Sequence, residues 1–125
     1  METKRDIAET LRLHKLWVNG DPRGVRADFS DADLRYADLR GEDLRGANLR
    51  RANLRGADLW GANLRGAMLR DANLRSADLG GADLRDADLR DADLSYADLS
   101  YADLRRANYW GANFRDAEPE SDATD

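Results

Sequence analysis

A five-residue unit repeats without a break through most of this chain, and this repeat constrains the fold more than any other feature. A large apolar residue recurs every five positions from Phe29 to Phe114, which makes 18 consecutive units. Alanine stands two positions before each of these residues, from Ala27 to Ala112, except at Glu42. An Asp or Asn usually stands between the two. Such self-similarity indicates a repeat architecture.

A period of five fits neither a regular helix nor a straight strand. Residues five apart on an α-helix are separated by about 140°, so no continuous apolar face forms. In a strand, alternation would send every second leucine to the opposite side. The pattern is satisfied only if each unit is a short extended piece, with Ala and Leu pointing the same way, followed by a bend. The sequence therefore predicts a solenoid with an apolar interior.

Length and composition predict one small domain without a metal or cofactor. The chain has 125 residues, which is within single-domain range. It has no apolar run of membrane-spanning length and its charged start lacks the core of a signal peptide, so we expect a cytoplasmic protein. The absence of cysteine excludes disulfides and thiolate sites, and a single histidine excludes a histidine cluster. The carboxylates do not follow a calcium-loop pattern.

The segment before the repeat has a helical period. Ile7, Leu11, His14 and Val18 fall on one stripe, and Asn19-Gly20 is a typical helix end. We expect residues 1–26 to form a helical cap and a turn that cover the open first coil. His14 lacks a partner base or nucleophile, so we expect it to pack rather than to transfer protons.

The repeat resembles that of the bacterial pentapeptide repeat proteins, whose consensus is A(D/N)LXX, over residues 27–116. The segment from His14 to Trp17, with the turn that follows it, is also similar to the lead-in of many members. The resemblance implies an all-β solenoid, a right-handed four-sided parallel β-helix with 20 residues per coil. Eighteen units then make about four and a half coils, a rod about 22 Å long. Residues 117–125 are acidic and predict a disordered tail.

With 20 residues per coil, outward residues stack in columns. A column of arginines has neighbouring aspartates that balance its charge. A column of aspartates has fewer such partners, because only Arg40 follows it and the equivalent positions are Trp60, Gly80 and Ser100. An acidic strip with exposed aromatic residues is typical of a protein-binding surface. Its candidate residues are Asp38, Asp58, Trp60, Asp78, Tyr96, Asp98 and Tyr101. The alternative is that Asp before Leu serves the turn, with its carboxylate bonded to local backbone amides.

Two positions depart from the repeat. Glu42 occupies an inward alanine position, where an unpaired carboxylate is costly. We expect it either to be displaced outward by a bulge or to lie where the cap meets the solenoid, with a partner such as an arginine of the first coils. Met68 replaces the Asp or Asn before Leu69. We interpret both as structural departures rather than sites.

The sequence favours a binding protein over an enzyme, because no nucleophile, base or metal site is placed for catalysis. The first hypothesis is a protein-protein interaction scaffold. The second follows from the resemblance, since some members of the family act as DNA-shaped inhibitors or protectors of DNA gyrase. The net charge of −5 argues against direct nucleic-acid binding.

The DNA-mimic hypothesis depends on local charge. Residues 71–103 hold nine acids against three arginines. Their net charge of −6 is close to the roughly five charges that DNA carries over the same rise. The candidate acidic zone comprises Asp78, Asp83, Asp86, Asp88, Asp91, Asp93 and Asp98. The chain has no inserted loop of the kind that gyrase-directed members often carry, which weighs against this function.

Bulky rings replace leucine at the far end of the repeat. An open coil end would expose an apolar patch and unpaired backbone groups. Because the acidic tail is a poor cover, we expect a homodimer joined through the last coil, a mode that the family uses. Its candidate residues are Tyr109, Trp110 and Phe114.

Overall fold

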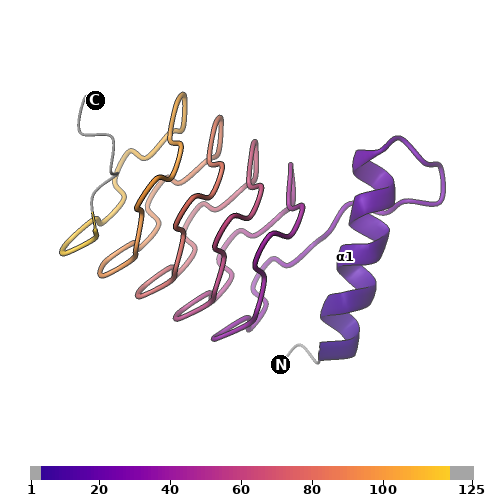
Figure 1. Cartoon of the computed structure of the whole chain (residues 1–125), viewed down its shortest axis with the longest axis horizontal. Coiled ribbons are helices and arrows are strands. Elements are labelled where there is room, and N and C mark those ends of the chain that lie inside the picture. Colours follow the sequence, from indigo (N-terminus) through magenta and orange to yellow (C-terminus); the bar gives the residue numbers. More distant parts are fainter. Residues whose placement is uncertain (1–3, 119–125) are drawn as a thin grey trace.

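The computed structural model describes residues 4–118, which form one helix followed by a stack of coils (Figure 1). Helix α1 spans Lys4–Val18. The coils are joined by isolated parallel β-bridges between residues 20 apart, such as Asp38 with Asp58. The predicted solenoid, its 20-residue period and its N-terminal helix are confirmed. The strands of the expected β-helix are reduced to single bridge residues.

The interior of the coils is made of the repeated leucines and alanines. Leu49 to Leu94, taken every five residues, are each 0% exposed, and the alanines two positions before them are at most 1% exposed. The short alanine side chain leaves room for the leucines of the same coil to meet at the centre. The predicted inward positions are therefore correct.

Every backbone N–H of a typical unit has an acceptor. In the unit 57–61, three N–H groups donate to carbonyl oxygens of the neighbouring coils and a fourth closes the turn from the preceding unit, all at 2.7 to 2.9 Å. The remaining N–H, on Trp60, donates to Oδ1 of Asp58 at 3.1 Å. The Asp or Asn before leucine thus supplies the one acceptor that the coils lack. The hydrogen bonds to local backbone amides that the sequence predicts for these aspartates are therefore present.

The bend after each unit requires a left-handed residue. The fifth residue of all 18 units has a positive φ, from Asp31 at 60° to Asp116 at 54°, and seven of these residues are glycines. Glycine adopts this conformation without strain, and Asp tolerates it better than most other residues. The turn chemistry therefore explains the abundance of Gly and Asp at this position.

Helix α1 ends in a Schellman motif. Gly20 has a φ of 79°, and its N–H donates to the carbonyl of Trp17 at 3.1 Å, while the N–H of Asp21 donates to the carbonyl of Leu16 at 3.0 Å. The chain then returns against the helix at Gly24, where an added Cβ would lie 2.1 Å from the backbone nitrogen of Trp17. Only glycine permits this close approach.

His14 fixes the cap to the first coil. Its side chain is buried. Nδ1 accepts the N–H of Ala27 at 2.9 Å, so the neutral ring carries its proton on Nε2 and donates to the carbonyl of Arg45 at 2.9 Å. The ring also stacks on Trp17, with centroids 5.4 Å apart. The predicted packing role of His14 is confirmed.

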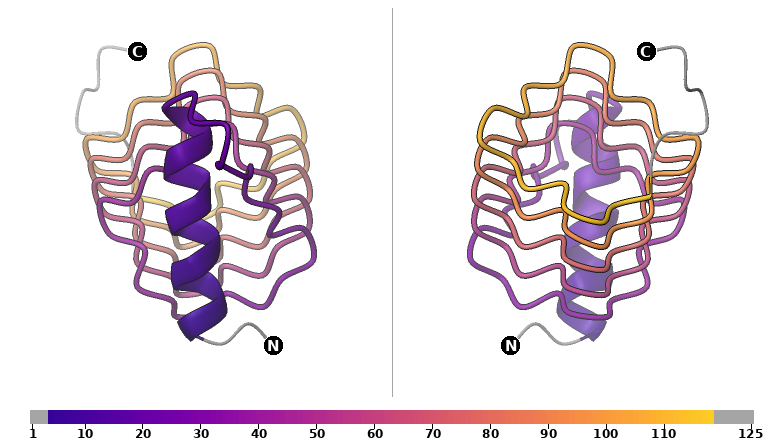
Figure 2. Two further views of the ribbon diagram at one scale, coloured as in Figure 1. Left: turned by 90° about the vertical axis from the view of Figure 1, so that its right-hand side faces the viewer. Right: turned by 90° about the vertical axis from the view of Figure 1, so that its left-hand side faces the viewer.

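The helix lies across the first coil, and the last coil forms the opposite end of the stack (Figure 2). Ile7 and Leu11 pack against the core from the helix. At the other end, the bridge between Asp98 and Glu118 continues the ladder to the last described residue. The expectation of disorder for the rest of the tail, 119–125, lies outside the described residues. Between residues 4 and 118, no helix is long and apolar enough to cross a membrane.

Candidate functional site

The four predicted aspartates form one column on the surface. Parallel bridges join Asp38 to Asp58, Asp58 to Asp78 and Asp78 to Asp98. We call this side of the rod the acidic face and define it as residues 38–41, 58–61, 78–81 and 98–101. Arg40 is its sole basic residue, and glycines occupy four of its outward positions. The face is therefore negative and has little relief.

Local bonds hold the carboxylates of this column. Arg40 donates to both oxygens of Asp38, at 2.9 and 2.8 Å, and these bonds lower the pKa of Asp38 to about 2. Arg40 also lies 3.6 Å from Asp58. Further along the rod, Asp78 accepts the backbone N–H of Gly80 and Asp98 accepts that of Ser100, each at 2.9 Å. The Ser100 side chain also hydrogen-bonds to Asp98 and lowers the pKa of that carboxyl. No arginine or lysine of the described range 4–118 forms an ion pair with either carboxylate, and both are partly exposed to solvent.

Two aromatic residues stand on this face. Trp60 is 60% exposed and Tyr101 is 77% exposed. The indole of Trp60 covers Gly80, where an added Cβ would lie 3.0 Å from Cδ1. Tyr96 lies at the preceding corner, as the fifth residue of its unit, and the centroid of its ring is 4.7 Å from Cζ of Arg75. The structure thus brings Trp60 and Tyr101 together with the aspartates but leaves Tyr96 on the adjoining side.

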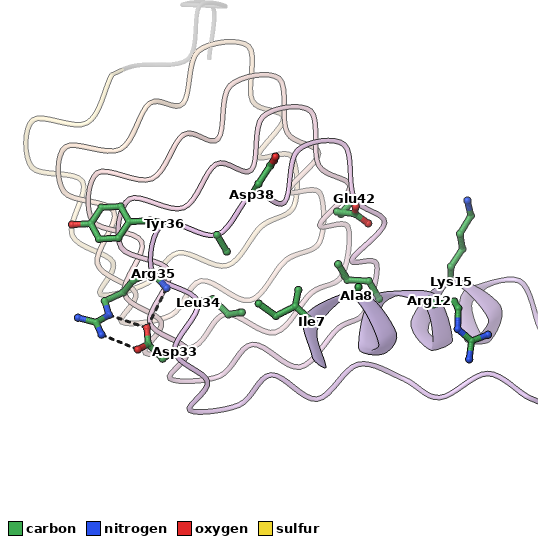
Figure 3. A pocket seen from close by; sticks show the side chains of 12 residues that line it. Ile7, Ala8, Arg12, Lys15, Asp33, Leu34, Arg35, Tyr36, Asp38 and Glu42 are labelled. Atoms are coloured by element: carbon green, nitrogen blue, oxygen red, sulfur yellow. Dashed lines mark hydrogen bonds and ion pairs between the residues drawn. The ribbon is translucent and has the colours of Figure 1, made fainter. Parts of the chain in front are cut away.

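A groove that the sequence did not reveal lies between α1 and the first coil (Figure 3). Its volume is approximately 790 Å³, and its apolar lining comes from both elements: Ile7, Ala8, Leu11, Leu34 and Ala37. We call it the cap groove. A shallower hollow of approximately 450 Å³ adjoins it and includes Trp60. Asp38 and Glu42 line both hollows, so the cap groove opens onto the acidic face.

Glu42 lies where the cap meets the solenoid, one of its two expected locations. Its side chain is half-buried, and burial raises its pKa, while the charge of Lys15 acts in the opposite direction. The expected arginine partner is wrong, because no ion pair or hydrogen bond joins the Glu42 carboxylate to any residue of the described range 4–118. The arginines of the first coil instead form ion pairs with the aspartates two positions before them in the sequence.

We expect Glu42→Ala to raise the free energy of unfolding at pH 7 by about 1 kcal/mol, because it removes an unpaired half-buried charge and restores the repeat. The raised pKa means that the native state holds the Glu42 proton more tightly than the unfolded state does. Wild type therefore loses stability relative to the variant as the pH rises through that pKa. Urea unfolding at pH 7 and at pH 4 measures the difference, which should shrink at the lower pH. A variant less stable than wild type at pH 7 would contradict this prediction.

Met68 interrupts the turn pattern without creating a site. Its column neighbours, Asn48 and Asp88, each accept the N–H two residues later. The thioether cannot do so as well, and the N–H of Arg70 has no such acceptor within the described chain. The sulfur instead lies 3.4 Å from Nη2 of Arg26. Met68 is thus a structural departure, as the sequence indicated.

The seven acids of the proposed DNA-mimic zone do not form one surface. Asp78 and Asp98 belong to the acidic face, but the other five are distributed over the remaining sides and corners. Asp83, Asp86 and Asp88 form ion pairs with arginines at 2.6, 2.9 and 2.7 Å. Each pairing lowers the pKa of the carboxyl through the guanidinium hydrogen bonds. The zone therefore presents less negative charge than its acid count suggests.

The candidate dimer residues occupy different parts of the last coil. Tyr109 and Phe114 take inward positions and meet edge to face, with ring centroids 5.7 Å apart. Trp110 takes an outward position and is 74% exposed. Tyr109 is itself 52% exposed, since no other element of residues 4–118 covers this end. The end is apolar and accessible at Tyr109.

Two buried polar side chains, those of His14 and Ser95, are engaged in local hydrogen bonds. Both ring nitrogens of His14 are used in packing, and the buried hydroxyl of Ser95 donates to Asp93 at 2.6 Å. Among residues 4–118, no group of three or more His, Cys, Asp or Glu is placed to hold a metal ion. What the surface does offer is unpaired negative charge, exposed rings and a groove.

Comparison with known sequences identifies the repeat. A family model described as pentapeptide repeats, in eight copies, matches residues 27–66, 47–86, 72–111 and 97–118. No curated protein matches the chain.

Three solved pentapeptide repeat proteins are similar to the chain. The one from the thylakoid lumen of Arabidopsis thaliana is 34% identical, with 76% of this chain and 69% of that chain covered and a TM-score of 0.70. One from the cyanobacterium Cyanothece 51142 is 30% identical, with 79% of this chain and 68% of that chain covered and a TM-score of 0.75. A third, from Nostoc, is 32% identical, with 83% of this chain and 93% of that chain covered and a TM-score of 0.56.

Proposed function

Because this chain belongs to the pentapeptide repeat family, we propose that it is a non-catalytic scaffold that binds another protein through its acidic face. The rod is a right-handed, four-sided coil in this proposal, and its cap, solenoid and tail are the segments 1–26, 27–116 and 117–125. The observation that carries the proposal is the unpaired carboxylates of Asp78 and Asp98 beside the exposed rings of Trp60 and Tyr101.

The rigid backbone makes this face suitable for recognition. Because the coils bond to one another at every unit, the outward side chains keep fixed spacings and lose little freedom on binding. Aromatic residues supply most of the energy at protein interfaces, and complementary charge raises the association rate. A basic partner surface with a flat or convex shape fits these properties.

We expect the variant Asp58→Asn, Asp78→Asn, Asp98→Asn to lose the captured partner while it keeps its thermal stability. Asparagine occupies the same position in other units and accepts the same backbone N–H, as Asn63 does at 3.1 Å, so only the charge is removed. Trp60→Ala should weaken capture by about tenfold or more. Affinity capture from a lysate, with circular dichroism melting of each variant, measures both properties. Arg55→Ala, on another side of the rod, is the control and should change neither.

Modulation or protection of DNA gyrase remains the alternative function. The ion pairs of Asp83, Asp86 and Asp88 reduce its support, since a copy of DNA needs unneutralised charge along the rod. A gyrase supercoiling assay with the purified protein separates the two functions. Inhibition or protection that is lost in the triple asparagine variant would favour the alternative, and absence of any effect on supercoiling would leave the scaffold function.

A second copy of the chain covers the open C-terminal coil in this proposal. The exposed ring of Tyr109 beside Phe114 is the apolar surface that would be buried. We expect sedimentation velocity to give a dimer for wild type and a monomer for Tyr109→Glu, with similar melting of the coils in both. Trp110→Ala tests whether the outward ring contributes. A monomeric wild type at micromolar concentration would contradict this arrangement.

A further inference from the structure

One carboxylate in the cap groove has no partner, although its neighbours are paired. Asp33 binds Arg35 and Asp38 binds Arg40, each at 2.8 Å. Glu42 makes no hydrogen bond or ion pair with any described residue, and burial raises its pKa. The groove therefore contains a half-buried negative charge that lacks a contacting cation.

The basic residues near the groove do not supply that cation. Arg12 is engaged with Glu9 at 2.6 Å on the exposed side of the helix. Lys15 affects Glu42 only through space and forms no ion pair within the described chain. Lys15 is exposed and lines the rim of the groove, and in Figure 3 its side chain points away from Ile7 and Leu34. A cation from outside could therefore contact Glu42 without displacing an existing pair.

The shape of the groove suits a long side chain with a charged end. Ile7, Ala8 and Ala37 provide an accessible apolar lining near the carboxylate. Figure 3 shows Ile7 directed toward Leu34, which is buried behind this lining. Lysine and arginine bury their aliphatic stems along such surfaces and keep the charged group at the edge. Trp60, at 60% exposure, stands in the adjoining hollow, where an aromatic ring also attracts cations.

From these observations, we infer that the cap groove anchors an arginine or lysine side chain of the protein partner. The stem lies on the apolar lining and the charged group makes charge-assisted hydrogen bonds to Glu42. This inference rests on the proposed function, because it places the partner's basic anchor at the cap end of the acidic face. It also gives Glu42 a role that the repeat itself does not require, since the column continues with Ala62, Ala82 and Ala102.

The test uses N-acetylarginine amide, titrated into the full ¹⁵N-labelled chain and followed by the NMR signals of the Gly41 amide and the Trp60 indole. We expect saturable shifts at these signals. N-acetylnorleucine amide has an aliphatic stem without the charge and should bind about tenfold more weakly or worse. Glu42→Ala should abolish the preference for arginine while the protein stays folded, because alanine is the residue of the repeat. Glu42→Gln removes the charge with little change of shape.

The inference would be overturned if norleucine bound as tightly as arginine, if arginine gave no saturable shift, or if arginine binding were unchanged in Glu42→Ala. Binding of N-acetylglutamate amide in place of arginine would assign the groove to an anion at Lys15 and would also overturn it. The partner-capture experiment separates this inference from the proposed function. If the triple asparagine variant loses the partner and Glu42→Ala retains it, the scaffold function stands and the anchor is wrong.

Discussion

Replacement of one central leucine, Leu64→Ala, is expected to lower the free energy of unfolding by about 3 kcal/mol and the melting temperature by on the order of 10 °C. Leu64 is 0% exposed and has buried leucines on either side in its own coil and in the coils above and below. The coil cannot collapse around the missing atoms, because its backbone is bonded to both neighbouring coils. Chemical unfolding followed by circular dichroism measures the loss.

Two control variants show whether this loss of stability comes from burial in the interior. Leu104→Ala makes the same change in the last full coil, where the leucine is only half-buried, so the expected loss is clearly smaller. Arg55→Ala changes an exposed side chain that forms no ion pair with any described residue. Its free energy of unfolding should stay within about 0.5 kcal/mol of the wild-type value. Equal losses at Leu64 and Leu104 would show that the interior is not packed as the structure has it.

The second large effect is expected at the cap. His14→Phe keeps a ring against Trp17 but leaves the N–H of Ala27 and the carbonyl of Arg45 without their partner. Each buried unsatisfied group costs roughly 1–3 kcal/mol, so the variant should lose about 2–6 kcal/mol of its free energy of unfolding. Thermal unfolding of the two proteins at pH 8 gives this difference.

The same residue predicts a pH dependence with a definite sign. Burial lowers the pKa of His14 below its ordinary value of 6.5, and Arg26 and Arg45 act in the same direction, while the Arg45 carbonyl and Asp43 oppose them. Between the lowered pKa and 6.5, the unfolded chain binds more protons than the native state. The stabilisation by His14 is therefore complete above pH 6.5 and decreases as the pH falls through the folded pKa.

The difference between wild type and His14→Phe isolates this effect, since the carboxyl groups titrate in both proteins. We expect the stability difference to narrow steadily as the pH is lowered from 7 toward 5. A difference that stays constant over this range would show that His14 does not act as a neutral hydrogen-bonding partner, and a difference that widens would mean that its pKa is raised.

Much of the candidate site could be predicted because the repeat places residues by position. Once 20 residues make one coil, the stacking of Asp38, Asp58, Asp78 and Asp98 follows from arithmetic, as does the place of Trp60 and Tyr101 beside them. Tyr96 was harder to place, because a residue at a corner can turn to either adjoining side. Its contact with Arg75 decides the matter, and this contact depends on two flexible side chains.

The sequence alone determined the solenoid, its buried alanines and leucines, the helix before it and the column of aspartates. These features repeat at fixed spacing, so each follows from local geometry and burial. The tertiary structure decided the cap groove, the unpaired state of Glu42 and the neutralisation of Asp83, Asp86 and Asp88. These depend on how a helix of a different period lies on the first coil and on which of several nearby partners a charged side chain selects. The position of the helix and the choice of ion-pair partner both depend on distances between segments far apart in the sequence. A five-residue pattern does not encode those distances.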